Sequence, residues 1–398
     1  MTHVAVTHVE NPGPLTLAAK WRAVFVAFTG IGVVTFAAGL FVDPVRAWHN
    51  FVIAQFMFLL FALAGLFFTA MHHAVNASWV IAVRRVAEGM TAYLPLALAA
   101  WIVLAVFGLD KVYPWAAGTV EFSDPLKVHW LSPLWVGVRD GIFILIWIFF
   151  ARKLTGYSVK QDETGDPWLS RKAMNWSIAF MPFFAGTFSL MSFDLMMSLE
   201  PRWYSTMFGV YCFAGLFQSG LALITLIFLW LKRSGPLAQA ATASHAKDLG
   251  TLLFAFTIFM TYIGFSQYML IWYANLPEET FYFAKRMDGG WIWLFVALPL
   301  VKFAIPFFGL LSQAAKKNER WLMAVCWVVI VGQYLDIYWM TMPAAYPKFV
   351  PISWMEIGTF LLFAGAFGLA VTRFFSKHSV LAARDPRILD SVNWRFWE

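Results

Sequence analysis

Charge and cysteine are both scarce in this sequence. Only 13% of its 398 residues are charged, whereas a water-soluble domain carries about 25%. The two cysteines, Cys212 and Cys326, each stand alone inside an apolar stretch, and we interpret them as small packing residues. Because the sequence has no CxxCH motif and no cysteine cluster, it offers no attachment for a c-type haem and no ligand set for an iron–sulfur cluster.

The histidines do not pair in the way that a b-type haem requires, which is two imidazoles on facing helices at similar depth. His72 and His73 lie at one end of an apolar stretch, and no other stretch offers a histidine at that level. We therefore expect this chain to bind no metal and no cofactor by itself. His72, His73 and the nearby Glu88 are candidates for contacts with lipid headgroups or the next loop, or for relaying protons on that side. Arg84 and Glu88 are spaced to form an i, i+4 ion pair.

Apolar residues dominate instead. They make up 61% of the chain, in runs of about 20 that are long enough to cross about 30 Å of hydrocarbon as a helix. A spanning segment must satisfy its own backbone, and the pattern is not the alternating one of barrel strands. The sequence thus predicts an all-α polytopic membrane protein, with its longest connections at 110–130, 152–173 and 232–248. The ten predicted spans are about 22–42, 51–75, 90–109, 131–151, 174–194, 204–231, 250–274, 290–313, 321–342 and 352–375.

Positive charge in the connections predicts the orientation. Twenty of the 29 Lys and Arg residues fall on the even-numbered connections and the two ends, and seven fall on the odd-numbered connections. The positive-inside rule therefore places both termini in the cytoplasm, and the net charge of +7 indicates contact with anionic lipid, not with nucleic acid. The chain divides into a cytoplasmic N-terminal segment (1–21), a ten-helix transmembrane domain (22–375) and a cytoplasmic tail (376–398). We expect the aromatic residues of that tail to lie on the membrane or against a neighbouring subunit.

Two acids stand at the junction of spans five and six, in the stretch SFDLMMSLEPRWYSTMFGVY at 192–211. Glu200 precedes a proline, which pushes its backbone out of the helical region and closes the turn, and its plainest interpretation is a solvated loop acid. Asp194 follows about 20 span residues and is still flanked by apolar side chains. An acid there is costly unless it is paired or faces water, so function is the default hypothesis. Four tryptophans near span ends are typical of an interfacial aromatic belt: Trp79, Trp130, Trp203 and Trp291.

Further ionisable side chains lie within the spans. Arg139 and Asp140 are about eight residues into span four, on the order of 12 Å deep, and each needs its own partner on another helix. Lys302 lies near the centre of span eight between Pro299 and Pro306, which remove backbone hydrogen bonds and bend the helix. Two interpretations stay open: buried ion pairs that set helix register, and a polar cavity or proton path open toward the periplasm. The candidates are Asp194, Asp336, Lys302, Arg139, Asp140, Glu356 and Gln333.

Four stretches together resemble one family: ASWVIAVRRVAEGM, LMSFDLMMSLEPRWYSTMFGVYCFAG, FSQYMLIWYANLPEETFYFAKR and FAIPFFGLLSQAAKKN. In this order, across about residues 50–345, they are similar to ActF, the second large membrane subunit of alternative complex III, a bacterial quinol:cytochrome c oxidoreductase. This subunit belongs with the NrfD-like membrane anchors of the polysulfide-reductase type. The resemblance implies two four-helix bundles plus two extra helices. The positions that match the family's pattern are Asp194, Glu200, Trp203, Glu278 and Glu279, of which the last two join the candidates for a proton path or quinol pocket.

The same resemblance implies a cellular setting. It places the chain in the bacterial inner (cytoplasmic) membrane beside a sister NrfD-like subunit and periplasmic iron–sulfur and multihaem cytochrome c subunits, which hold the clusters and haems. A quinol, menaquinol or ubiquinol, would enter from the lipid. Three hypotheses follow. The chain contributes to quinol binding or a transmembrane proton path while anchoring redox subunits, and is not catalytic alone; it is a cofactor-free structural scaffold; or it is a secondary transporter, for which the proline-bracketed Lys302 is the hint.

Overall fold

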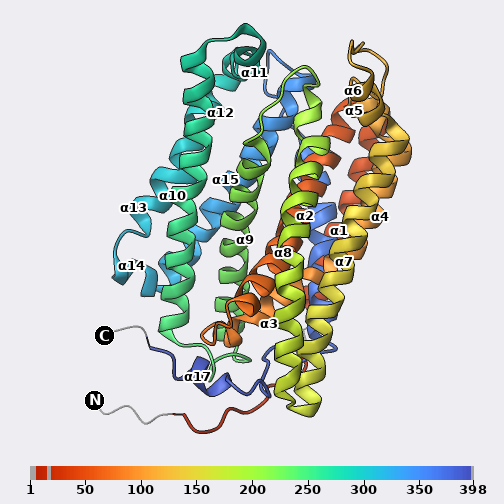
Figure 1. Ribbon diagram of the computed structural model, residues 1–398. Coiled ribbons are helices and arrows are strands. Elements are labelled where there is room, and N and C mark those ends of the chain that lie inside the picture. Colours follow the sequence, from red (N-terminus) through yellow and green to blue (C-terminus); the bar gives the residue numbers. More distant parts are fainter. Residues whose placement is uncertain (1–5, 16–18, 396–398) are drawn as a thin grey trace.

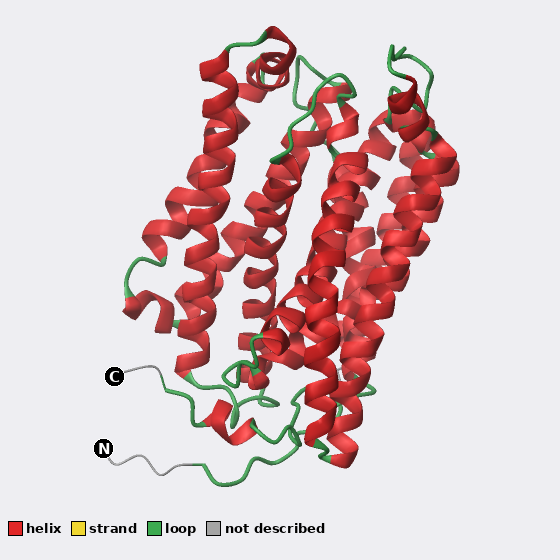
Figure 2. Ribbon diagram, viewed as in Figure 1, coloured by secondary structure: helices red, strands yellow, loops and turns green. Residues whose placement is uncertain are grey.

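The computed structural model describes residues 6–15 and 19–395, and over those residues its regular structure is helical (Figures 1 and 2). Ten helical segments in the described part are long and apolar enough to cross a membrane, which confirms an all-α, multi-pass membrane protein. These ten are α1 (Ala19–Val42), α2 (Pro44–Ala74), α3 to α4 (Ile81–Met90 and Leu94–Phe107), α7 (Pro133–Thr164), α8 (Pro167–Leu195), α9 (Phe208–Arg233), α10 (Ala243–Ala274), α12 to α13 (Trp291–Pro299 and Ile305–Gly309), α15 (Glu319–Ala345) and α16 (Trp354–Phe375). The shorter elements are η1 (Thr91–Tyr93), α5 (Leu109–Val112), α6 (Pro125–Trp130), η2 (Met197–Leu199), α11 (Pro277–Met287), the π-helical turn η3 (Leu300–Ala304), α14 (Gln313–Lys317) and α17 (Ile388–Val392).

Two helices extend well past their apolar stretches. The segment 152–173 is predicted as a connection, but α7 continues to Thr164 and α8 begins at Pro167. Gly165, with φ of 67°, ends the first helix in the left-handed region. Asp166 caps the second by accepting a hydrogen bond from the amide two residues on. The predicted long loop is therefore wrong, because hydropathy detects the apolar length of a helix and not the polar turns beyond it.

The spans form two groups of four and one pair. Helices α2, α4, α7 and α8 pack on one another, and so do α9, α10, α12–α13 and α15, while α1 packs along α16. Contacts of α2 with α9 and α15 join the two groups. This arrangement agrees with the expected two four-helix bundles plus two extra helices.

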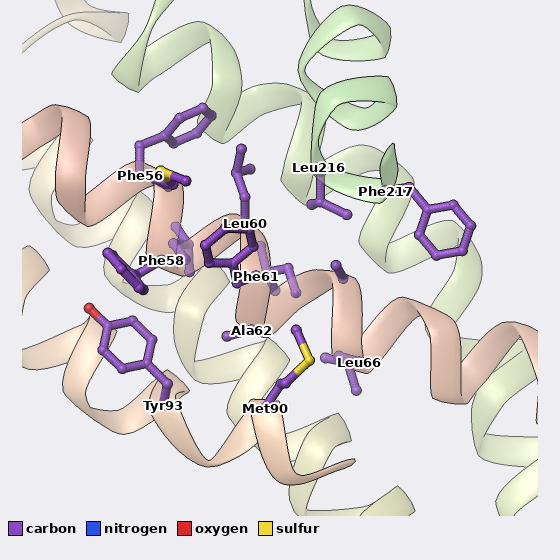
Figure 3. Close-up of a cluster of buried hydrophobic side chains, with 14 of the residues drawn as sticks. Phe56, Phe58, Leu60, Phe61, Ala62, Leu66, Met90, Tyr93, Leu216 and Phe217 are labelled. Atoms are coloured by element: carbon purple, nitrogen blue, oxygen red, sulfur yellow. The ribbon is translucent and has the colours of Figure 1, made fainter. Parts of the chain in front are cut away.

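Helix α2 lies at the centre of the molecule, and almost all of its spanning residues are buried. Figure 3 shows part of this core, in which Phe58 and Phe61 of α2 lie near Tyr93 of η1. On another side, Gly220 allows α9 to approach closely, because a Cβ there would lie 2.0 Å from the Cβ of Ala64. The core of this protein is thus one helix enclosed by others.

Both termini lie at the same end of the bundle (Figure 1). The described part of the tail, 376–395, packs on that end rather than extending away. The Ser391 hydroxyl donates to the Trp79 carbonyl at 2.7 Å, and the Trp394 indole donates to Asp248 at 2.7 Å. The tail aromatic that the structure describes therefore docks on its own chain, and residues 396–398 lie outside the described residues.

Candidate functional site

A cavity of about 300 Å³ lies between α9, α10, α11, α12, η3 and α15, in the half of the bundle that carries α11. Half of its lining residues are aromatic, among them Phe283, Phe295 and Trp339. Phe265, which also lines it, is 60% exposed on the outside of the bundle. The cavity therefore reaches the lipid-facing surface, and its volume suits a small apolar ligand.

Polar groups converge at the inner end of this cavity. The Lys302 ammonium donates to Asp336 at 2.5 Å and to Gln333 at 2.8 Å. The Tyr211 hydroxyl donates to the other Asp336 oxygen at 2.5 Å. Lys302 and Asp336 are both buried. This acid is thus held by two donors from two different helices, and all three side chains line the cavity.

The break in span eight explains how Lys302 reaches this position. Pro306 has no N–H, so the carbonyl four residues earlier, that of Lys302, loses its helical donor. Gln218 on α9 replaces that donor at 3.0 Å. The backbone here forms the π-helical turn η3 between the two prolines. The freed carbonyl is therefore satisfied by an amide side chain, rather than serving the ammonium itself.

A second cluster forms nearer the end of the bundle opposite the termini. Arg139 of α7 contacts Asp194 of α8 at 2.8 Å and lies 3.9 Å from the centroid of the Trp130 ring. The Trp130 indole donates to the other Asp194 oxygen at 3.2 Å. Asp194 also lines a separate cavity of about 470 Å³ that Asp124 and Tyr204 border. The structure thus pairs Asp194 and leaves it beside a second opening.

Asp140, next to Arg139 in sequence, has a different environment. Its side chain is fully buried, and neither carboxyl oxygen has a hydrogen-bond partner. It interacts electrostatically with both Asp194 and Arg139. Burial of a carboxyl without hydrogen-bond donors is costly, so Asp140 is an exception among the buried polar groups of this bundle.

A stacked wall separates the two cavities. Trp203 lines the second cavity and Tyr282 lines the first, and their rings stack with centroids 3.8 Å apart. The Arg286 guanidinium lies 3.5 Å from the centroid of the Tyr282 ring on α11. Burial raises the pKa of Tyr282 to about 12 and lowers the pKa of Arg286. Trp203 is buried, so its prediction as an interfacial belt residue is wrong.

Glu200 is an anchor for this wall rather than a solvated loop acid. Its carboxylate contacts Lys285 at 2.8 Å and Arg286 at 3.9 Å, and its side chain is 13% exposed. The prediction of a solvated acid is wrong because helix α11 folds back over the turn, and the local sequence gives no sign of this contact.

The remaining candidates on this side lie outside the two clusters. Glu356 accepts both N–H groups of a bidentate Arg46 contact at 2.8 Å and forms the capping box of α16 with Ser353. This acid therefore begins a helix and ties it to α2. Glu278 and Glu279 occupy the first turn of α11 at the protein surface and have no ion pair among the described residues.

The candidates on the side of the termini form a network of ions. Arg84 contacts Glu88 at 3.2 Å, which confirms the predicted i, i+4 pair, and also contacts Asp385 of the tail at 2.9 Å. Arg85 contacts Glu88 at 3.3 Å and Asp162 of α7 at 2.5 Å. The two arginines of α3 therefore link this helix to α7 through Asp162 and to the tail through Asp385, while Glu88 lies between them.

The two neighbouring histidines are buried. The His72 ring lies 2.8 Å from the Phe68 carbonyl through Nδ1 and packs on Trp79, so it contacts the next loop as one interpretation predicts. His73 has no hydrogen-bond partner at Nε2. Neither ring is exposed enough to face lipid headgroups.

No protein-family model matches this chain, and no curated protein matches it. Within 6–15 and 19–395, no group of three or more His, Cys, Asp or Glu side chains could hold a metal ion. Interpretation of the site therefore depends on its geometry.

Sequence reasoning overlooks two residues that complete the site. Tyr211 binds Asp336, yet in sequence it is one of many aromatics within a span. Arg286 supports the wall, although it is predicted only as a charge in a connection. Neither residue type nor spacing singles out these two side chains in the sequence.

Proposed function

We propose that this chain is a membrane subunit of a quinol-oxidising respiratory complex, and that it binds the quinol headgroup in the cavity above Lys302 and Asp336. The observation that carries the proposal is the combination of an aromatic cavity open to lipid with an acid, a base and a phenol at its inner end. A quinol is an apolar ring with a long isoprenoid tail, so it needs a lipid-accessible cleft. Its hydroxyl groups need a proton acceptor within hydrogen-bond reach.

The cluster suits proton transfer from such a ring. Oxidation of a quinol to a quinone releases two protons and two electrons. In this proposal Asp336 accepts the two protons one after the other, giving up the first before it takes the second, and Lys302 and Tyr211 hold its carboxylate in place. Because Lys302 compensates the buried negative charge, the acid can exist ionised at this depth. The electrons leave through iron–sulfur and haem c groups that we place in partner subunits.

The second cluster supports release of protons at the far side. Asp194 and Asp140 form a carboxyl pair with Arg139 at the edge of the 470 Å³ cavity. The distribution of Lys and Arg predicts that this end faces the periplasm. In the proposal, the pair passes protons to the outer water, and the chain also anchors periplasmic redox subunits in the inner membrane.

Neutralising one acid in each cluster tests the proposal. The variants Asp336→Asn and Asp194→Asn are compared with Glu121→Gln, which changes an exposed acid on a connection of the same side. The intact assembly is purified and its subunits, bound quinone and quinol:cytochrome c turnover are measured. We expect both variants to assemble, Asp336→Asn to lose turnover by about 10²-fold or more, and Glu121→Gln to behave as the unchanged protein.

Two other functions give different results. A cofactor-free scaffold keeps full turnover in both variants once assembly is verified. A secondary transporter is favoured by one observation, the broken helix with Lys302 on its π-helical turn, since transporters use such breaks near the membrane midplane. Purification with haem c subunits contradicts a stand-alone transporter, and purification without any redox partner contradicts our proposal.

A further inference from the structure

A groove runs along α7 at the end of the bundle that carries the termini. Its larger part, about 570 Å³, lies between α7, the start of α4 and the end of α16. Its smaller part, about 430 Å³, continues along α7 beside Leu145 and Phe149. The two parts share Ile148 and Arg152, so they form one continuous surface.

The groove changes character along the helix axis. Leu145, Phe149, Arg152 and Lys160 recur at spacings that place them on one face of α7. Arg152 is about 29 Å along the helix from Pro133 at 1.5 Å per residue, close to the full hydrocarbon thickness of about 30 Å. The apolar residues therefore lie within the hydrocarbon depth, Arg152 lies at its boundary, and Lys160 lies about 12 Å beyond it.

Three cations line this groove, and one of them, Lys153, lies over the rings of Phe149 and Trp176. Neither the Arg152 guanidinium nor the Lys160 ammonium has a hydrogen bond or ion pair with any described residue, and both side chains are exposed. The nearby Arg84 and Arg85, by contrast, form ion pairs with Glu88, Asp162 and Asp385. Unpaired cations over an apolar groove complement a ligand that is anionic at one level and apolar below it.

His378 forms the opposite wall of the groove, with its ring packed on Phe374 at 4.9 Å. Burial, Arg85 and Lys377 lower the pKa of His378, so its imidazole is neutral at pH 7 and retains one N–H to donate. Glu163 is the acid that lines the groove, and it lies at the outermost edge, beyond Lys160.

We propose that this groove binds one anionic glycerophospholipid, with its phosphate between Arg152 and Lys160 and its acyl chains along Leu145 and Phe149. The groove presents apolar side chains, then cations, then His378. This is the order in which a phospholipid presents its acyl chains, its phosphate and its polar headgroup. A zwitterionic lipid would place an ammonium group against two cations and binds less well. Inorganic phosphate shares the anionic chemistry but makes no use of the apolar part. Basic pockets between helices on the cytoplasmic side are where such headgroups bind.

The test measures lipid binding, and it is therefore independent of turnover. The delipidated full chain in detergent is titrated with phosphatidylglycerol, phosphatidylcholine or inorganic phosphate, and bound lipid is counted by native mass spectrometry. Arg152→Gln/Lys160→Gln is the test variant. Arg171→Gln/Lys172→Gln on α8 is the matched control, because it removes the same charge at the same end of the bundle outside the groove.

We expect one tightly bound phosphatidylglycerol on the unchanged protein and on the control, and about 30-fold weaker binding on the test variant. Gly156→Phe provides a second variant without a charge change, since Gly156 lines the groove and a Cβ there meets no atom within 4 Å. The added ring should displace the lipid. The proposal is overturned if the test and control variants bind phosphatidylglycerol equally, if phosphatidylcholine binds as well, or if inorganic phosphate binds as tightly as the lipid.

Discussion

Removal of one member of the Lys302–Asp336 pair should cost more stability than removal of both. The two charged groups are 2.5 Å apart and buried. Asp336→Asn leaves a buried ammonium beside neutral amides, with no negative charge to compensate it. Breaking a buried ion pair in this way costs about 3–5 kcal/mol. The double variant Lys302→Met/Asp336→Leu replaces both charges by apolar groups of similar size, and such replacements are often close to neutral. We therefore expect the double variant to be more stable than the single one by about 3 kcal/mol.

Unfolding in mixed micelles of mild detergent and dodecyl sulfate, followed by circular dichroism, measures these differences. Gln218→Leu is the control, because its amide binds the Lys302 carbonyl and not the ammonium. Gln218→Leu should lower the free energy of unfolding by about 1–3 kcal/mol, because it leaves the carbonyl unsatisfied. The loss should be the same in the unchanged protein and in the double variant. If the single and double variants unfold at the same detergent composition, Lys302 is not held as a buried cation, and the argument for an ionised Asp336 fails.

Three further predictions concern other parts of the molecule, with stability measured in the same way. Gly220→Val overpacks the contact of α9 with α2 and should lower the free energy of unfolding by about 1–3 kcal/mol. Gly186→Ala is the control and should cost nothing, because a new Cβ there has no atom within 4 Å. Equal losses of stability would contradict the close approach of the two helices. Asp194→Asn removes the carboxylate 2.8 Å from Arg139 and should lower the free energy of unfolding by about 3 kcal/mol. The additional change Arg139→Gln should restore most of it, because it removes the unpaired charge. If stability does not recover, the loss does not come from charge pairing. The pKa of His378 is lowered by burial, so its folded state favours the neutral ring: stability should fall as the pH drops through the ordinary histidine value of about 6.5, and level off below the folded pKa. His378→Gln should flatten that part of the profile, and an unchanged slope would assign it to another group.

Hydropathy predicts the spans well because a membrane helix must be apolar over a fixed length. It fails at 152–173, where Gly165 and the Asp166 cap separate two helices that both extend beyond the apolar region. Caps, not hydropathy, decide where polar helical turns outside the hydrocarbon end. The boundaries that differ most from the prediction are therefore the end of α7 at Thr164 and the start of α3 at Ile81.

Burial of the site residues was easier to predict than their pairing. The positions of Lys302 and Asp336 within spans mark both as costly ions, and the structure pairs them. Which acid meets which base depends on how each helix is rotated about its axis, and one sequence does not contain that rotation. Tyr211 could not be chosen for the same reason, since its role exists only because its ring faces Asp336.

The enclosed position of α2 has a consequence for biogenesis. This helix has the highest hydropathy of the ten spans in the described part of the chain, yet its neighbours α8, α9, α15 and α16 are synthesised later. It therefore enters the bilayer before these four neighbours, and acyl chains solvate the faces that the later helices then cover. The side chains of α2 are thus surrounded first by lipid and later by protein. A polar substitution there would impede insertion before any tertiary contact had formed.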